Sequence, residues 1–166
     1  MNIYFGLGSN LGNRLQNLRD AAERLRVFGR IIKCSDVYET SAWGGIEQPD
    51  YLNACMSIES QNESLTPFEI LNRIKGFERE LGRVESVRWG ARKIDIDILL
   101  IDDLILLSDV LDVPHVRIPE RLFVLVPLKD ILPDSWRHPE NGKTIDEMIE
   151  GVKSEGEYAL RVTGLL

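Results

Sequence analysis

Two aspartates alternate with isoleucines in the segment Ile94-Asp95-Ile96-Asp97-Ile98. This alternation is typical of a β-strand with one buried face. It places both carboxylates on the other face, about 6.6 Å apart along the strand. Such a pair can hold one or two hard cations through oxygen ligands, as magnesium prefers in phosphate-transfer sites. The alternative is an ordinary solvated strand face, and the pair alone does not decide between the two.

A basic segment leads into this strand. Residues 73–93 contain seven basic and three acidic side chains, which gives a local charge of +4 in a chain of net charge −7. Because a planar guanidinium group can bind two phosphate oxygens at once, Arg83, Arg88 and Arg92 would suit a nucleotide. A solvated charged helix end explains Arg73 and Arg79 well, but it explains Arg83, Arg88 and Arg92 less well. A basic loop that leads into an acidic strand has the arrangement of charges that a magnesium–nucleotide site needs.

Aromatic and amide side chains could form a second part of the site. Tyr51, Trp43 and Phe123 could make a flat slot for an aromatic ring, and the Asn53 amide could read the edge of a heterocycle. Strand alternation places Tyr51 and Asn53 on the face that carries the aspartates, above two glycines of residues 2–8. The alternatives are a core position for Phe123 and a strand-end position for Tyr51.

Other motifs are weaker. Residues 6–12 contain three glycines, but a leucine stands where GxGxxG requires the third glycine. Residues 142–144 resemble the end of a P-loop, but the upstream glycine and the preceding strand are missing. His115 follows a proline, and a lone histidine is more often structural than catalytic. We place His138 at the surface.

Hydrophobic periodicity and capping signals predict the elements that position these residues. The clearest helix start is Thr66-Pro67-Phe68-Glu69, with an N-cap, a proline at the first helical position and a glutamate at N3. The predicted strands are 2–8, 31–40, 51–59 and 94–101, with a short one at 104–107. The predicted helices are 13–28, 66–81, 121–131 (interrupted at Pro127) and 144–150. The order βαββαβ predicts a ferredoxin-like α+β sandwich, with an antiparallel sheet, both helices on one face and the active site on the other.

Length and composition narrow the class of protein. The 166 residues suit one domain, 1–166, in which 133–166 form a peripheral C-terminal extension. The charge of −7 argues against a general nucleic-acid binder, and no apolar stretch reaches the roughly 20 residues of a membrane span. The N-terminus lacks the features of a signal peptide. Cys34 and Cys55 lack metal-ligand spacing and are interpreted as buried free thiols. We expect a cytoplasmic monomer.

Several segments, taken together and in this order, are specific to one enzyme family. They are GSNLG at 8–12, SDVYET at 35–40, QPDYLNA at 48–54, GR at 82–83, RWGARKIDIDILL at 88–100, PH at 114–115 and RLFVLVPL at 121–128. With them the chain resembles the 6-hydroxymethyl-7,8-dihydropterin pyrophosphokinases of folate biosynthesis. The resemblance covers roughly residues 5–130, and it implies the ferredoxin-like fold that the element order predicts independently.

The resemblance also implies an activity and a role for each candidate residue. Pyrophosphate would pass from ATP to the hydroxymethyl group of the pterin, giving AMP. Asp95 and Asp97 would hold two Mg²⁺ ions against the ATP phosphates, and Arg83 and Arg92 would engage the phosphates from a mobile loop. The implied ATP contacts are Glu78, Arg88, Trp89, Arg92, Ile98, His115 and Arg121. The implied pterin contacts are Thr40, Ser41, Trp43, Tyr51, Asn53, Asp95 and Phe123.

The chain also departs from the family pattern. Ala91 replaces the usual proline of Trp-Gly-Pro-Arg, and Lys75 stands where a neutral amide is common.

Two other functions fit parts of the sequence. A nucleotidyltransferase could use the same aspartate pair and would release pyrophosphate. A non-catalytic ligand-binding or RNA-binding module could share the fold, although the acidic pair argues against the basic sheet face that RNA needs.

Overall fold

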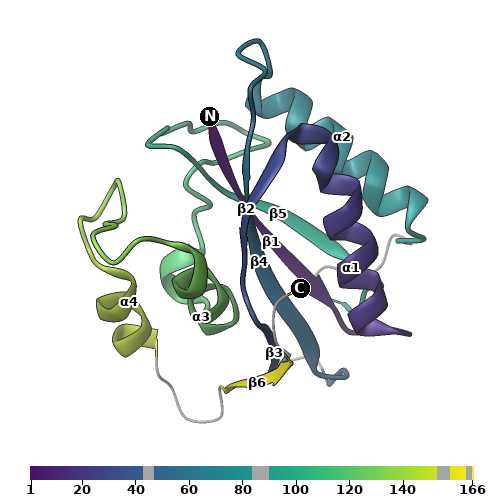
Figure 1. Ribbon diagram of the computed structural model, residues 1–166. Helices are drawn as coiled ribbons and strands as arrows, with labels where there is room; N and C mark the ends of the chain where they lie inside the picture. The colour runs from purple at the N-terminus through teal and green to yellow at the C-terminus, as the bar shows by residue number, and fades with distance from the viewer. Residues whose placement is uncertain (43–46, 84–89, 153–157, 164–165) are drawn as a thin grey trace.

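The computed structural model describes residues 1–42, 47–83, 90–152, 158–163 and 166. Within these residues the centre is a six-stranded antiparallel sheet in the order β5-β1-β4-β3-β6, and β2 also pairs with β4 (Figure 1). The strands are β1 (Asn2–Ser9), β2 (Arg30–Cys34), β3 (Val37–Thr40), β4 (Tyr51–Glu59), β5 (Asp95–Ile101) and β6 (Ala159–Thr163). The predicted α+β class and antiparallel sheet are confirmed.

Helices cover both faces of the sheet. The α-helices are α1 (Arg14–Leu25), α2 (Pro67–Glu80), α3 (Leu122–Ile131) and α4 (Ile145–Val152). In Figure 1, α1 and α2 lie on one side of the sheet, as the βαββαβ order predicts, whereas α3 and α4 lie on the other. Each side has its own hydrophobic cluster, the first around Phe5 and Met56 and the second around Leu99 and Leu125. The face that carries the aspartates is therefore partly covered.

Both helices of the first layer begin at the predicted caps. The Asn13 side chain accepts a hydrogen bond from the backbone N–H of Gln16 at 3.2 Å. Thr66 and Glu69 form the full capping box at the start of α2, with Pro67 at its first position. These caps fix where α2 starts, and the apolar stripe of the helix then packs on the sheet with Ile70 and Ile74 fully buried.

The predicted strand 31–40 is two strands, separated at Ser35 and Asp36. The Ser35 hydroxyl accepts a hydrogen bond from the backbone N–H of Cys55 at 2.8 Å, and the Ser35 N–H donates to the Cys55 carbonyl at 2.9 Å. A side-chain oxygen thus replaces one backbone acceptor of the ladder, which interrupts the strand. Both cysteines are free thiols, as predicted, but only Cys55 is fully buried.

Continued alternation along β5 predicts that Leu100 lies on the same face as Ile94, Ile96 and Ile98, but this prediction is wrong because β5 contains an irregularity. Phe5 pairs with Ile98 and Tyr4 pairs with Leu100, so Leu99 has no counterpart on β1. The extra residue ends the simple alternation after Ile98. Leu99 and Leu100 both belong to the cluster under α3, while Ile98 remains in the cluster under α1 and α2. The irregularity lies after both aspartates and leaves their predicted face unchanged.

The C-terminal third differs most from prediction. α3 runs through Pro127 without interruption, and the predicted strand 104–107 is reduced to a single bridge between Leu106 and Val113. His138 is buried rather than at the surface, with 3% exposure and its ring edge-on to Trp136. β6 was not predicted. It lies near the end of the chain and joins the far edge of the sheet.

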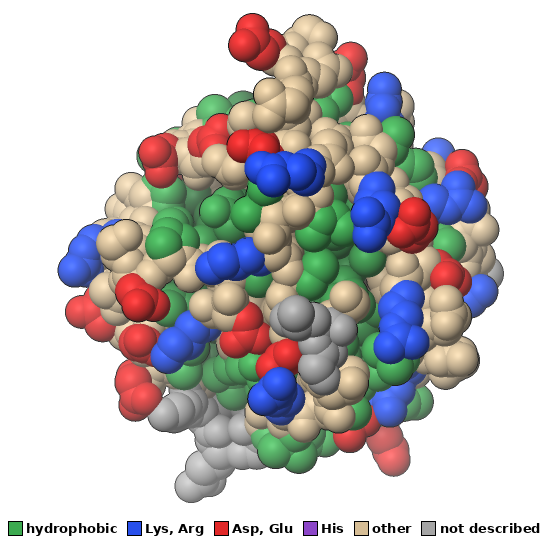
Figure 2. Space-filling model, in the orientation of Figure 1, with side chains coloured by type: hydrophobic (Ala, Val, Ile, Leu, Met, Phe, Trp, Pro, Cys, Tyr) green, Lys and Arg blue, Asp and Glu red, His purple; other side chains and the backbone are tan. Residues whose placement is uncertain are grey.

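No helix among the described residues is both long and apolar enough to cross a bilayer. On the face drawn in Figure 2, acidic and basic side chains are interspersed rather than separated by sign. General nucleic-acid binding would use a continuous basic surface, and that face does not present one.

Candidate active site

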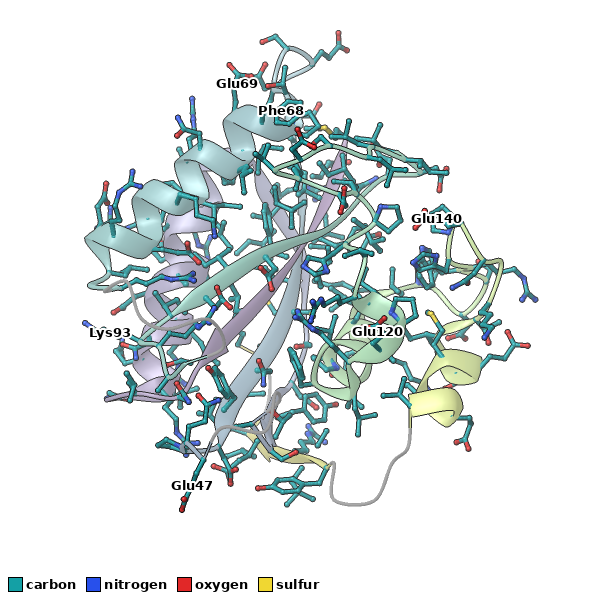
Figure 3. All side chains as sticks on the ribbon, turned by 180° about the vertical axis from the view of Figure 1, so that it is seen from behind. Glu47, Phe68, Glu69, Lys93, Glu120 and Glu140 are labelled. Carbon is teal, nitrogen blue, oxygen red and sulfur yellow. The ribbon has the colours of Figure 1, made fainter. Side chains whose placement is uncertain are left out.

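The end of β1 brings the two predicted halves of the site together. Gly8 pairs with Asn53 of β4 on one side and with Asp95 of β5 on the other. Figure 3 shows Glu47 and Lys93 on the loops at this end of the sheet. The predicted strand faces are therefore correct at the site: Asn53 and Asp95 flank a glycine floor.

A cleft of about 730 Å³, including its open mouth, lies above this floor. Asn53 is buried and donates a hydrogen bond from Nδ2 to the Thr40 hydroxyl at 2.8 Å, which fixes the amide. The Arg121 guanidinium lies 5.3 Å from the centre of the Phe123 ring. The predicted residues that line this cleft are Thr40, Ser41, Tyr51, Asn53, Arg92, Asp95, Asp97, Arg121 and Phe123.

A second cleft of about 700 Å³, including its open mouth, begins at Asp97 and extends along the other side of β5. Lys75, Ile98 and His115 line it, together with residues 108–112. Burial, followed by repulsion from Arg121, lowers the pKa of His115 to about 4, so its ring is neutral at pH 7. Nδ1 accepts a hydrogen bond from the Arg117 N–H at 3.1 Å. That bond assigns the ring proton to Nε2, which makes this nitrogen a donor.

Asp95 lies in a compact ion-pair cluster with Arg83 and Arg92. Arg83 Nη1 lies 2.5 Å from its Oδ1, and Arg92 Nη1 lies 2.9 Å from its Oδ2. Burial disfavours the carboxylate form, but the charges of Arg83 and Arg92 outweigh burial and lower the pKa of Asp95. Both predicted phosphate-binding arginines are therefore held beside the predicted metal ligand.

Asp97 has the opposite environment. Its carboxylate makes no hydrogen bond or ion pair with any residue in the described ranges, and it lines both clefts. Burial and the neighbouring charge of Asp95 raise its pKa to about 6, although Arg121 acts in the other direction. A half-buried carboxylate without a partner, at the junction of two clefts, is suited to receive a cation.

Glu78 lies beneath the site rather than in either cleft. It is 2% exposed and pairs with Arg83, and its carboxylate accepts from Lys75 Nζ at 2.9 Å and from the Ile96 N–H at 2.9 Å. Burial raises its pKa, while Lys75, the Ile96 N–H and Arg83 oppose that change. Glu78 therefore connects α2 to β5 and orients Arg83. Its role as a nucleotide contact remains a prediction, as do those of Arg88 and Trp89, which lie outside the described residues together with Trp43.

Sequence reasoning missed Asn10 as a site residue. Its Nδ2 donates to the Gln48 side chain at 3.1 Å and to the Pro49 carbonyl at 3.0 Å, and its Oδ1 accepts from the Arg92 N–H at 2.8 Å. Ser9, its neighbour, donates to the Lys93 carbonyl at 2.6 Å. One buried amide thus joins the segment before Tyr51 to the segment of Arg92. The sequence offered a signal, because the polar residues Ser9 and Asn10 stand directly after the predicted strand 2–8.

The chain is similar to known proteins over most of its length. A model of the 7,8-dihydro-6-hydroxymethylpterin-pyrophosphokinase (HPPK) family matches residues 4–133. The chain is 42% identical over 145 residues to the 2-amino-4-hydroxy-6-hydroxymethyldihydropteridine pyrophosphokinase of Aquifex aeolicus, covering 87% of this chain and 88% of that protein. It is 40% identical over 146 residues to the Bacillus subtilis enzyme of the same name, covering 87% and 86%.

A solved structure of wild-type Plasmodium falciparum HPPK-DHPS with pteroate has the same fold, with a TM-score of 0.69 over 90% of this chain. Identity to it is 16%, and this chain spans 42% of that chain, so the likeness concerns the fold alone. The family match agrees with the order of motifs along the sequence and with the two clefts beside Asp95 and Asp97. This chain belongs to the 7,8-dihydro-6-hydroxymethylpterin-pyrophosphokinase family.

Proposed function

We propose that this chain transfers the pyrophosphoryl group of ATP to the hydroxymethyl oxygen of 6-hydroxymethyl-7,8-dihydropterin. The observation that carries the proposal is the position of Asp97 at the junction of two clefts. One cleft has the aromatic and amide lining that suits a pterin. The other has an apolar wall and a neutral histidine donor, which suit the base and phosphates of a nucleotide. The relatives' names and the family match support the same reaction.

The two clefts would direct the substrates toward each other across β5. The pterin ring would stack between Tyr51 and Phe123, with its edge against Asn53. The hydroxymethyl oxygen would bond to the β-phosphorus as the bond from that phosphorus to the α–β bridging oxygen breaks. AMP leaves with the bridging oxygen, and the hydroxyl proton is released. The protein would take little direct part in the bond changes, so catalysis would consist of positioning the substrates and stabilising the charge of the transition state.

The donor set fits magnesium in number and chemistry. Asp95 and Asp97 offer hard oxygen ligands on one strand face, and no described group of three or more acidic, histidine or cysteine side chains could hold a metal without help. Phosphate oxygens and water would complete the shell, as is usual for magnesium. Two bound ions would neutralise phosphate charge. Arg83 and Arg92 would then shift from Asp95 to the phosphates. The predicted closure of loops 41–50 and 82–93 over the substrates concerns residues 43–46 and 84–89, which lie outside the described residues.

The remaining parts of the proposal concern the whole molecule. We regard the chain as one domain, 1–166, that acts as a monomer in the cytoplasm and takes ATP and the pterin as its partners. Size-exclusion chromatography with light scattering would test the monomeric state.

Replacing Gly8 with alanine should impair use of the pterin. A Cβ at this position would lie 2.8 Å from the Asn53 Oδ1, so the amide would have to move from its place against Thr40. We expect the KM for the pterin to rise about tenfold, on the order of 1.4 kcal/mol, with little change in the KM for ATP. Initial rates at saturating MgATP would measure this.

The control is Gly76→Ala in α2, where an added Cβ meets nothing within 4 Å. It should leave both KM values unchanged and favour the helix slightly. A pterin KM that stays at the wild-type value in Gly8→Ala would show that Asn53 does not contact the pterin.

The identity of the nucleotide product tests the proposed function. The protein is incubated with MgATP and 6-hydroxymethyl-7,8-dihydropterin, and the nucleotides are separated by chromatography. AMP should appear in a 1:1 ratio to the consumed pterin. ADP would indicate an ordinary kinase instead, and release of inorganic pyrophosphate would indicate a nucleotidyltransferase.

A further inference from the structure

Strand β6 extends the sheet beside the pterin cleft. It pairs antiparallel with β3, and Figure 1 shows it along the edge of that short strand. Thr40, which lines the cleft, pairs with Tyr51 of β4 on one side and with Ala159 of β6 on the other. β6 is therefore one strand away from Tyr51 and Asn53. The match to the family model ends at residue 133, so β6 lies outside the region that the model describes.

Side chains join the segment of residues 158–163 to Asp50, which precedes β4, and to Asp36, which precedes β3. Next to the cleft, the Tyr158 hydroxyl donates to Asp50 Oδ2 at 2.5 Å. At the far end, Arg161 Nε lies 2.5 Å from Asp36 Oδ2. These are two polar contacts of similar length, from neighbouring parts of one segment. Only the first contact reaches a residue next to the cleft.

Asp50 is the residue directly before Tyr51. Its carbonyl oxygen accepts a hydrogen bond from Arg14 Nη1 at 2.7 Å, and Arg14 Nη2 also pairs with Glu39 of β3 at 2.7 Å. The main chain at Asp50 is thus held by α1, and its side chain is held by Tyr158. Two restraints from different directions set where β4 begins, and hence where the Tyr51 ring stands over the cleft.

We propose that Tyr158 is a positioning residue for the pterin side of the site and acts through Asp50 on Tyr51. This inference rests on the proposed function for the identity of the ligand. Exposed polar contacts contribute little to the free energy of unfolding, so loss of the contact should leave the fold intact. A small displacement of an aromatic wall, by contrast, reduces productive binding of a stacked ring. The expected signature is a change in pterin use without a change in stability.

The test is a double-mutant cycle in the full chain with Tyr158→Phe, Asp50→Ala and the double variant. The matched control is Arg161→Gln, which removes the other polar contact from the same segment. We expect the KM for the pterin to rise about three- to fivefold in each single variant and no further in the double variant. The KM for ATP should stay within twofold of wild type. Thermal midpoints of Tyr158→Phe and Arg161→Gln should agree within about 2 °C.

Each outcome decides the point. Additive effects of the two single variants, an equal pterin effect in Arg161→Gln, or a wild-type pterin KM in Tyr158→Phe would overturn the positioning role. If the wild-type chain makes no AMP, the proposed reaction is wrong. The same cycle is then read by pterin binding in the presence of Mg²⁺ and α,β-methylene-ATP. Coupling between the two positions would still support the inference, and absence of pterin binding would overturn it as well.

Discussion

Replacing Asp97 with asparagine should lower kcat by about 10²- to 10³-fold, the size of effect that follows loss of one group that stabilises transition-state charge. In metal-free protein the same change should raise the free energy of unfolding. The folded pKa of Asp97 is raised to about 6, so ionisation disfavours the folded state. That penalty is fully present above pH 6 and disappears as the pH falls toward the unfolded pKa. We expect a gain on the order of 1–2 kcal/mol at pH 7, reduced from the full shift because the side chain is only half-buried.

Asp95→Asn is the matched control because it makes the same chemical change two residues away. The folded pKa of Asp95 is lowered, so its carboxylate stabilises the fold above the unfolded pKa, and this contribution is lost as the pH falls through the folded value. Its variant should therefore lose activity and stability together. Urea titrations at pH 7 in EDTA would measure the free energy of unfolding of the two variants. Stability changes of the same sign in the two variants would contradict the assigned environments.

Replacing Asn10 with alanine should have the second-largest effect. The change removes a buried amide that bonds to Gln48, Pro49 and the Arg92 N–H. Because buried polar groups would lose their partners, we expect a loss of about 1–3 kcal/mol in the free energy of unfolding. Since the same amide joins the segments on both sides of the site, kcat/KM should fall about 10- to 100-fold for the pterin and for ATP alike.

The comparison for this variant is Asn17→Ala. Asn17 is also buried, and its amide donates to Ser9 Oγ, the Leu11 carbonyl and the Lys93 carbonyl. It makes a similar number of hydrogen bonds, but none to residues 47–50. Asn17→Ala should cost similar stability and leave the pterin KM near wild type. If the two variants affect the pterin KM equally, Asn10 acts through general stability rather than by joining the two segments.

Local patterns predicted the parts of the fold that depend on neighbouring residues. Alternation placed Asp95 and Asn53 on one face correctly because the pairing of β1 with β4 and with β5 is regular near these two residues. The same reasoning failed at Leu100, where one extra residue shifts the register. The break in the strand at Ser35 likewise depends on a partner in another strand, because the Ser35 hydroxyl accepts a hydrogen bond from the Cys55 N–H. A single-strand pattern carries no information about such partners.

The packing of α3 on the sheet and the buried contacts of Glu78 could not be predicted from the sequence, because they also depend on partners far away in the chain. The sequence of α3 is apolar on most sides, and Pro127 suggested a break, but burial against the sheet supports a continuous helix. Glu78 was assigned to the nucleotide through the resemblance, whereas its buried contacts with Arg83 and Ile96 become visible only once α2 is docked on β5. Tyr158 and Asp50 are 108 residues apart in the chain.

The central claim is that a nucleotide and a pterin meet at Asp97 and that two phosphates move together. The most direct measurement uses ATP labelled with ³²P at the α position in one reaction and at the γ position in another. The proposed reaction predicts that the γ label moves to the pterin and the α label stays in AMP. Recovery of the α label on the pterin, or of the α label in ADP, would contradict it.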